Sequence, residues 1–120
     1  MAVHDDVLDP ERIAMLRELD DGDGELMGIL AREYETDSNV QLATMQRALA
    51  DADSEALVRS AHALKGASAN LGAGRLAELC ARLEELGRTG TLDGAVSLVE
   101  ASATELHDVH AALDQLLIEA

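Results

Sequence analysis

The sequence predicts an all-α fold, an antiparallel up-down four-helix bundle with a short additional N-terminal helix. The chain has 120 residues, and Tyr34 is the only Phe, Tyr or Trp among them. A core without such rings must be built from aliphatic side chains, which suits interlocking helices better than a sheet. Apolar residues recur at helical spacing between short turns, so successive helices should be antiparallel neighbours. The length supports one domain over residues 1–120.

The first helix is expected to begin at Pro10, where a missing backbone N–H costs nothing, with Asp9 as its N-cap. Three apolar residues follow at a spacing of three: Ile13, Leu16 and Leu19. The acidic, glycine-containing stretch 20–24 should end this helix.

A long second helix is expected from Glu25 to about Ala50, although three polar residues at 37–39 interrupt its apolar stripe. Asp51 or Asp53 should cap the third helix. The inner face of that helix is predicted to carry Leu57, Ala61, Leu64, Ser68 and Leu71.

Glycines at 72 and 74 should separate the third helix from the fourth, and Gly87 and Gly90 should close the fourth. The predicted inner face of the fourth helix is Leu76, Leu79, Leu83 and Leu86, with Cys80 alongside. The last helix is expected over residues 92–118. Its predicted inner stripe is Val96, Val99, Ala103, Leu106, Val109, Leu113 and Leu116.

The net charge excludes several classes of partner. Nine Lys and Arg stand against 24 Asp and Glu, which gives −15. Nucleic-acid binding and adhesion to anionic membranes both depend on basic residues, so we expect neither. The single cysteine excludes an intrachain disulfide, and the N-terminus lacks the basic and apolar regions of a signal peptide. We therefore expect a cytoplasmic protein, and we expect it to be a monomer.

No metal centre is expected. The stretch 20–24 fails as an EF-hand, because neither register of its glycines places an acidic residue at loop position 1. His107 and His110 lie three apart, but no other helix offers a Glu-x-x-His partner. One of these histidines should flank the core and the other should be solvated. Cys80 lies among leucines and is interpreted as a small core residue.

The third helix carries the constellation that points to chemistry. His62 lies on its outward column, with Lys65 three residues on, Gly66 four and Ala69 seven. Glycine within a helix costs about 1 kcal/mol relative to alanine, which suggests that something must approach the backbone here. A neutral imidazole is a nucleophile at pH 7, and an ammonium beside it would attract an anion. A phosphoryl acceptor fits this pattern; the alternatives are an ordinary surface histidine and a glycine that only permits helix packing.

The run from residue 62 to 73 resembles the central motif of the histidine-containing phosphotransfer (HPt) domain family of two-component phosphorelays. The residues that carry the resemblance are His62, Leu64, Lys65, Gly66, Ser68, Leu71, Gly72 and Ala73. The likeness extends through residues 75–88 and includes the leading helix, so it covers nearly the whole chain. It implies a four-helix bundle with a reactive histidine exposed midway along one helix.

The resemblance also implies roles for single residues. His62 would be the phosphorylated residue, Lys65 the cation that assists the phosphoryl group, and Gly66 the small residue that lets a partner approach. Ala69, which the helical period places on the same outward column, should add to that access by its small side chain. Glu84, on the facing helix, stands where several members carry a Gln that hydrogen-bonds near the histidine. A carboxylate there could favour the imidazolium and repel phosphate, or it could orient the ring by accepting its N–H.

The implied function is that of a phosphocarrier. His62 would accept a phosphoryl group from the aspartyl phosphate of a receiver domain and pass it to another receiver. These receivers would belong to response regulators or hybrid histidine kinases. The partner would supply Mg²⁺, and the chain would bind no cofactor itself. Autonomous kinase activity is not expected, because the sequence has no glycine-rich phosphate-binding loop.

Related functions differ at identifiable positions. A histidine-kinase dimerisation helix would carry Glu and Pro where Ala63 and Ala67 stand. The phosphoacceptor domain of chemotaxis kinases would continue into kinase domains, so a chain ending at Ala120 is expected to be a free-standing shuttle unless it was excised. A phosphorylation-independent helical adaptor that binds receiver or kinase domains stays open as the alternative.

Docking is expected to rest on apolar area around His62, because a charge of −15 gives little attraction to an acidic pocket. The candidate docking residues are Ile13, Leu16 and Val58. A four-helix core does not need a fifth helix to close, so we expect Ile13 and Leu16 to be partly exposed near His62. The competing interpretation makes both of them core residues.

Overall fold

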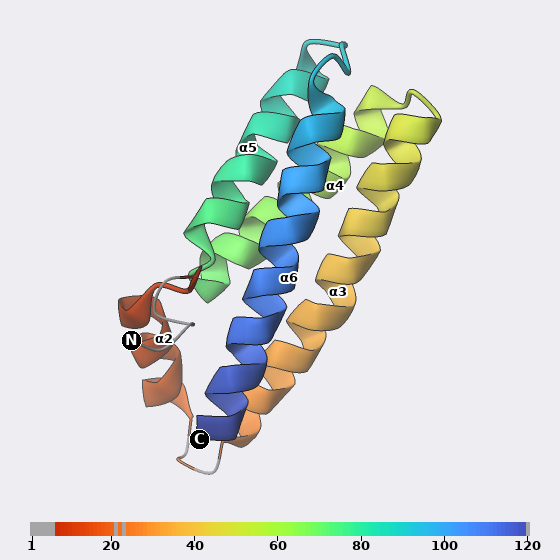
Figure 1. The fold of residues 1–120 in the computed structure, drawn as a ribbon. Coiled ribbons are helices and arrows are strands. Elements are labelled where there is room, and N and C mark those ends of the chain that lie inside the picture. The colour runs from red at the N-terminus through yellow and green to blue at the C-terminus, as the bar shows by residue number, and fades with distance from the viewer. Residues whose placement is uncertain (1–6, 21, 23, 120) are drawn as a thin grey trace.

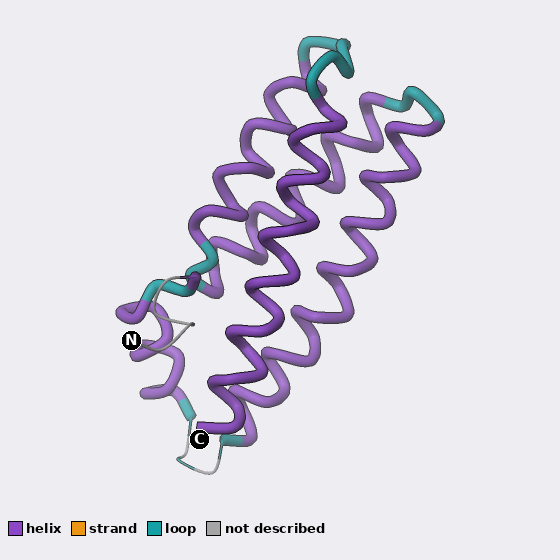
Figure 2. Tube along the Cα trace, viewed as in Figure 1, coloured by secondary structure: helices purple, strands orange, loops and turns teal. Residues whose placement is uncertain are grey.

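The computed structural model describes residues 7–20, 22 and 24–119, and within these ranges the chain forms helices and no strand (Figure 1, Figure 2). The helices are α2 (Pro10–Leu19), α3 (Glu25–Ala50), α4 (Ser54–Leu71), α5 (Gly74–Arg88) and α6 (Ala95–Glu119). The predicted all-α class is therefore confirmed. None of the helices in the described ranges is long and apolar enough to span a membrane.

Acidic side chains define where two of the helices begin. The Asp9 carboxylate accepts the backbone N–H of Glu11 at 3.0 Å, and Pro10 occupies the first turn of α2, as expected. Asp53, rather than the residue at 51, caps α4 by accepting a first-turn N–H at 3.1 Å. Both caps satisfy backbone donors that a helix cannot satisfy itself.

Asp20 organises the turn before α3. One of its carboxylate oxygens accepts the N–H groups of Gly22 at 3.0 Å and Gly24 at 3.2 Å. The other accepts the N–H of Met27, in the first turn of α3, at 3.2 Å. Asp20 thus supplies a carboxylate to backbone donors at the start of α3, where negative charge is favourable.

The four long helices enclose a common core. α4 packs against α3 and α5, and α6 packs against the same two helices (Figure 1). α2 lies at one end, against α3 and α4. The Asp9 N–H donates to the Gly72 carbonyl at 2.9 Å, which ties the start of α2 to the left-handed glycine that ends α4.

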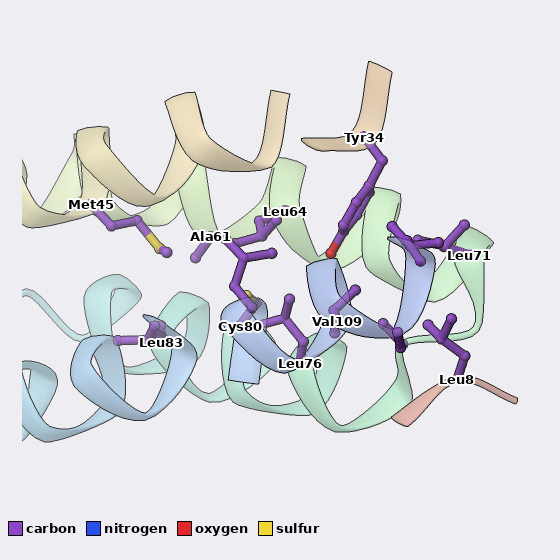
Figure 3. Packing of buried hydrophobic residues seen from close by; sticks show 14 of the residues in the cluster. Leu8, Tyr34, Met45, Ala61, Leu64, Leu71, Leu76, Cys80, Leu83 and Val109 are labelled. Carbon is purple, nitrogen blue, oxygen red and sulfur yellow. The ribbon is translucent and has the colours of Figure 1, made fainter. Parts of the chain in front are cut away.

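Aliphatic side chains build most of the core, as the composition predicted, and Tyr34 packs among them (Figure 3). All five predicted inner residues of α4 are buried. The buried apolar residues of α5 are Leu76, Leu79, Cys80 and Leu83. Burial raises the pKa of the Cys80 thiol to about 12, so this side chain is a core residue and a poor nucleophile, as expected.

The expectation for α2 is wrong at one residue. Ile13 is only 6% exposed, because α2 packs on α3 and α4 and adds this side chain to their core. Leu16 is half-buried against the same core, as expected. Leu19, at the end of the stripe, is 71% exposed.

One further expectation is wrong in α6, and Gly87 of α5 has a packing role that was not expected. Val96 is 56% exposed, because Ala95 and Val99 take the inner positions at the start of α6. α5 ends at Arg88, between Gly87 and the left-handed Gly90, as expected. A Cβ at Gly87 would come within 2.7 Å of Val58 Cγ2, so this glycine serves the close approach of α4 and α5.

Candidate functional site

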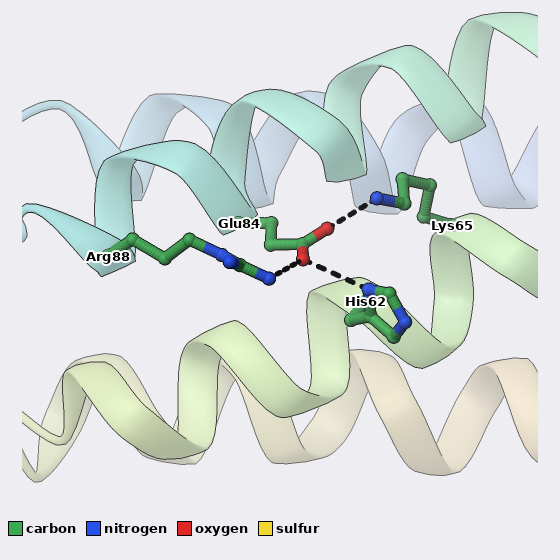
Figure 4. A network of polar contacts seen from close by, with 4 residues as sticks. All are labelled: His62, Lys65, Glu84 and Arg88. Atoms are coloured by element: carbon green, nitrogen blue, oxygen red, sulfur yellow. Dashed lines mark hydrogen bonds and ion pairs between the residues drawn. The ribbon is translucent and has the colours of Figure 1, made fainter.

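His62 lies on the outer face of α4. Its side chain is 65% exposed, whereas Ala61 and Leu64 beside it are fully buried. The ring nitrogen Nδ1 lies 2.9 Å from Glu84 Oε2 on α5, and the other nitrogen points away from that carboxylate (Figure 4). An ionised carboxylate can only accept, so Nδ1 carries the proton and donates it. Neutral His62 therefore keeps the Nε2 lone pair open at the surface.

Glu84 is a buried carboxylate that accepts from three side chains. It is 5% exposed. Lys65 Nζ donates to Oε1 at 2.6 Å, and the Arg88 guanidinium donates to Oε2, the oxygen that also accepts from His62. The hydrogen bond from Lys65, followed by those from Arg88 and His62, lowers the pKa of Glu84 to about 2, although burial acts in the opposite direction. Glu84 is therefore ionised at neutral pH.

The surface around His62 is far less acidic than the whole chain. The two positive charges of Lys65 and Arg88 exceed the single negative charge of Glu84. Residues 54–88 carry five of the nine basic residues and four of the 24 acidic ones. Residues 95–119 carry five acidic residues and no Lys or Arg. The net charge of −15 therefore says little about the field that a partner meets at His62.

Gly66 and Ala69 leave the outer face of α4 open. Both are exposed, and a Cβ at Gly66 would meet none of the described residues within 4 Å. The interpretation that Gly66 serves internal helix packing is therefore wrong. Gly87 has that role instead, against Val58.

The candidate docking residues do not share a single surface. Val58 lines a groove of about 450 Å³ on the α5 side of α4, which Arg88 also borders. Leu16 lines a groove of about 420 Å³ on the α3 side, together with Ala67. Ile13 is buried. Docking roles for Leu16 and Val58 stay predictions, and the burial of Ile13 favours the competing interpretation of Ile13 as a core residue.

Arg88 is a site residue that the sequence analysis missed. It follows Glu84 by four residues on α5, a spacing at which an acid and a base meet on one face of a helix. That spacing was a usable signal. Together with the resemblance, which already implied that Glu84 lies near His62, this spacing could have pointed to Arg88.

His110 and His107 have the environments that the sequence predicted. His110 Nε2 lies 2.9 Å from Ser38 Oγ, beside the core, and His107 is exposed. Among the described residues, no group of three or more His, Cys, Asp or Glu is placed to hold a metal ion.

Known families and solved structures include proteins that are similar to this chain. Residues 29–117 match the family model of the Hpt domain. The chain is similar to the crystal structure of histidine-containing phosphotransfer protein B (HptB) from Pseudomonas aeruginosa PAO1. The two are 33% identical with a TM-score of 0.87, and the alignment covers 95% of this chain and 96% of that one. A search of curated proteins found no match.

Proposed function

Because the chain belongs to the Hpt domain family and has a histidine phosphotransfer role in phosphorelays, we propose that His62 is the residue that carries the phosphoryl group. The geometry of its ring supports this assignment most directly. Nδ1–H is held by the ionised Glu84 at 2.9 Å, and Nε2 stays open on an exposed face. The nucleophilic atom is thus fixed before a partner arrives.

The donor in this proposal is the aspartyl phosphate of a receiver domain. The Nε2 lone pair forms a P–N bond while the P–O bond to the aspartate breaks, and the aspartate carboxylate leaves with that electron pair. The proton stays on Nδ1, so the ring becomes positive as the bond forms. Its hydrogen bond to Glu84 strengthens with that charge, as in other carboxylate–histidine pairs. The reverse reaction delivers the phosphoryl group to another receiver.

Lys65 and Glu84 assist His62 in different ways. The Lys65 ammonium is held on the same carboxylate as the ring and is about a third exposed, so it can attract phosphoryl oxygens. Of the two roles that the sequence left open for Glu84, the contact with Nδ1 supports orientation of the ring. The open backbone at Gly66 and Ala69 gives the partner room to reach Nε2.

The partners in this proposal are receiver domains of response regulators or hybrid histidine kinases, and they supply Mg²⁺ with the aspartate. Phosphoryl transfer needs positioning and charge more than covalent chemistry from the protein, and this chain supplies the nucleophile and the cations. We infer a cytoplasmic monomer without autonomous kinase activity, and neither nucleic acid nor membranes as partners. We also infer that α3 to α6 form an antiparallel up-down bundle with α2 as the additional helix; their mutual packing supports this.

The test is transfer from a panel of purified receiver domains phosphorylated with acetyl phosphate. We expect acid-labile, base-stable phosphate on the chain, located on His62 by mass spectrometry under alkaline conditions. Phosphate on another residue would contradict the assignment. Binding of receivers without any phosphate on the chain would instead support the phosphorylation-independent adaptor.

A further inference from the structure

A negative charge beside a histidine that accepts phosphate is unfavourable, because the phosphoryl group is itself negative. We propose that Arg88 is a positioning residue that neutralises Glu84, so that this carboxylate can orient His62 without repelling the phosphoryl group. The inference rests on the proposed function of His62.

Arg88 acts on the carboxylate oxygen that faces the ring. Glu84 Oε2 accepts from both His62 Nδ1 and the Arg88 guanidinium, whereas Lys65 holds Oε1 (Figure 4). A carboxylate oxygen has lone pairs for two donors, so neither contact excludes the other. Arg88 is therefore the cation bound to Oε2, the same oxygen that accepts the hydrogen bond from His62 Nδ1.

Two features of the fold place Arg88 beside the Glu84 carboxylate. The spacing of four residues places Arg88 and Glu84 on the same face of α5. The missing Cβ at Gly87 lets α5 approach α4 at Val58, one turn before His62. Glu84 can therefore reach across to α4 while its own helix supplies the neutralising charge.

A second cation also changes what Lys65 can do. With Arg88 present, one positive charge balances Glu84 and the other is in excess. Lys65 can then turn towards phosphoryl oxygens without leaving a buried carboxylate unpaired, which would be costly. Without Arg88, a Lys65 side chain that moved towards the phosphoryl group would leave the buried Glu84 carboxylate without a cation.

The experiment uses potassium phosphoramidate, a small phosphoryl donor that needs no docking surface. Nε2 displaces ammonia, so a P–N bond forms as another breaks, and ³¹P NMR follows the phosphohistidine. The variants are Arg88→Gln, Glu84→Gln and the two combined. Arg82→Gln is the matched control, because Arg82 is exposed on the same helix and has no contact with the Glu84 carboxylate among the described residues.

We expect Arg88→Gln to slow phosphorylation about fivefold when residue 84 is Glu, a modest effect because Arg88 is exposed and screened. In the Glu84→Gln background the same change should cost less than about twofold, because no carboxylate is left to neutralise. Arg88→Lys should recover part of the rate, and Arg82→Gln should leave it unchanged.

Two results would overturn the inference: an unchanged rate for Arg88→Gln, or the same loss in both backgrounds. The second result would mean that Arg88 acts on the donor directly. Circular dichroism and denaturant midpoints of the variants should match those of the unchanged chain. Failure of the proposed function would be distinguishable, because a variant without His62 would then still take up phosphate.

Discussion

His62 and His110 both hydrogen-bond to a neighbouring helix, yet they use the same ring atom in opposite ways. His110 Nε2 lies 2.9 Å from Ser38 Oγ. The Ser38 hydroxyl donates its hydrogen to the Tyr34 carbonyl at 2.5 Å, so it accepts from Nε2–H. In His62 the proton lies on Nδ1, where Glu84 accepts it, and Nε2 is left open.

The partners of the two rings also differ in charge. His110 lies edge-on to Tyr34 at a centroid distance of 6.0 Å, and the Tyr34 hydroxyl pairs with Ser68 at 2.9 Å. Burial lowers the pKa of His110, which favours its neutral form. His62 instead meets an ionised carboxylate that two cations balance.

The difference shows that the choice of anchor decides which nitrogen can react. The half-buried His110 ring is held by the neutral Ser38 hydroxyl, because charge is costly away from water. An exposed ring can be held by a charged cluster, which fixes one nitrogen and leaves the other to a partner. Four predictions separate the His62 surface from the His110 interior, beginning with the largest effect.

His62→Gln should abolish phosphate acceptance while the fold stays intact, because Gln has no imidazole nitrogen and the side chain is exposed. The measurement is phosphate incorporation from a phosphorylated receiver, with circular dichroism as the check on folding. The matched control is His110→Gln, which should still be labelled. Labelling of His62→Gln, or loss of its helical signal, would break the distinction between the two histidines.

Ile13→Ala tests whether Ile13 of α2 belongs to the core or to the docking surface. Because Ile13 is buried in the common core, we expect a loss of about 2–5 kcal/mol in the free energy of unfolding, with receiver affinity nearly unchanged. Chemical denaturation beside a binding titration measures both. A stable variant with affinity weakened by about 1–2 kcal/mol would return Ile13 to the docking surface.

Gly66→Gln should slow transfer from a receiver about tenfold, because a side chain would fill the space beside His62 that the partner needs. It should also stabilise α4 by roughly 0.5–1 kcal/mol. Gly87→Ala is the contrasting substitution. It should destabilise the fold, because the added Cβ would collide with Val58. Stopped-flow transfer at matched receiver concentration tests the first claim, and an unchanged rate would show that Gly66 does not face the partner.

His110→Gln should cost about 1 kcal/mol of stability at pH 7, through the loss of a part-buried hydrogen bond. The cost should shrink as the pH falls to 5. The pKa of His110 is lowered below its ordinary value of 6.5 mainly by burial, which outweighs the attraction of Asp114. Below 6.5 the unfolded chain therefore binds more protons than the folded one, so the stability that His110 contributes falls as the pH falls.

Denaturant titrations of the unchanged protein and of His110→Gln, each at pH 7 and pH 5, measure how the stability cost of the substitution changes with pH. A cost that stayed constant over this range would mean that His110 titrates alike in the folded and unfolded chains. His62→Gln is the control, because it leaves the Ser38 contact in place.

Local signals in the sequence were sufficient for the helices and for the exposed position of His62 on α4. Asp9 and Pro10 mark a helix start by their own backbone chemistry, and Asp53 does the same for α4. The inner face of α4 followed from a period of 3.6 residues, which also placed His62 on the outside. These features depend on neighbours within one or two turns, so a linear sequence contains them.

The sequence did not decide how each helix is rotated or what it meets. Val96 follows the apolar period of α6 but is exposed, and Ile13 is buried although four helices can close without α2. The role of Glu84 was open for the same reason: 22 residues separate it from His62. Only the close approach of α4 and α5 joins His62, Glu84 and Arg88, because contact between side chains on two helices depends on their rotation and separation, which no local period encodes.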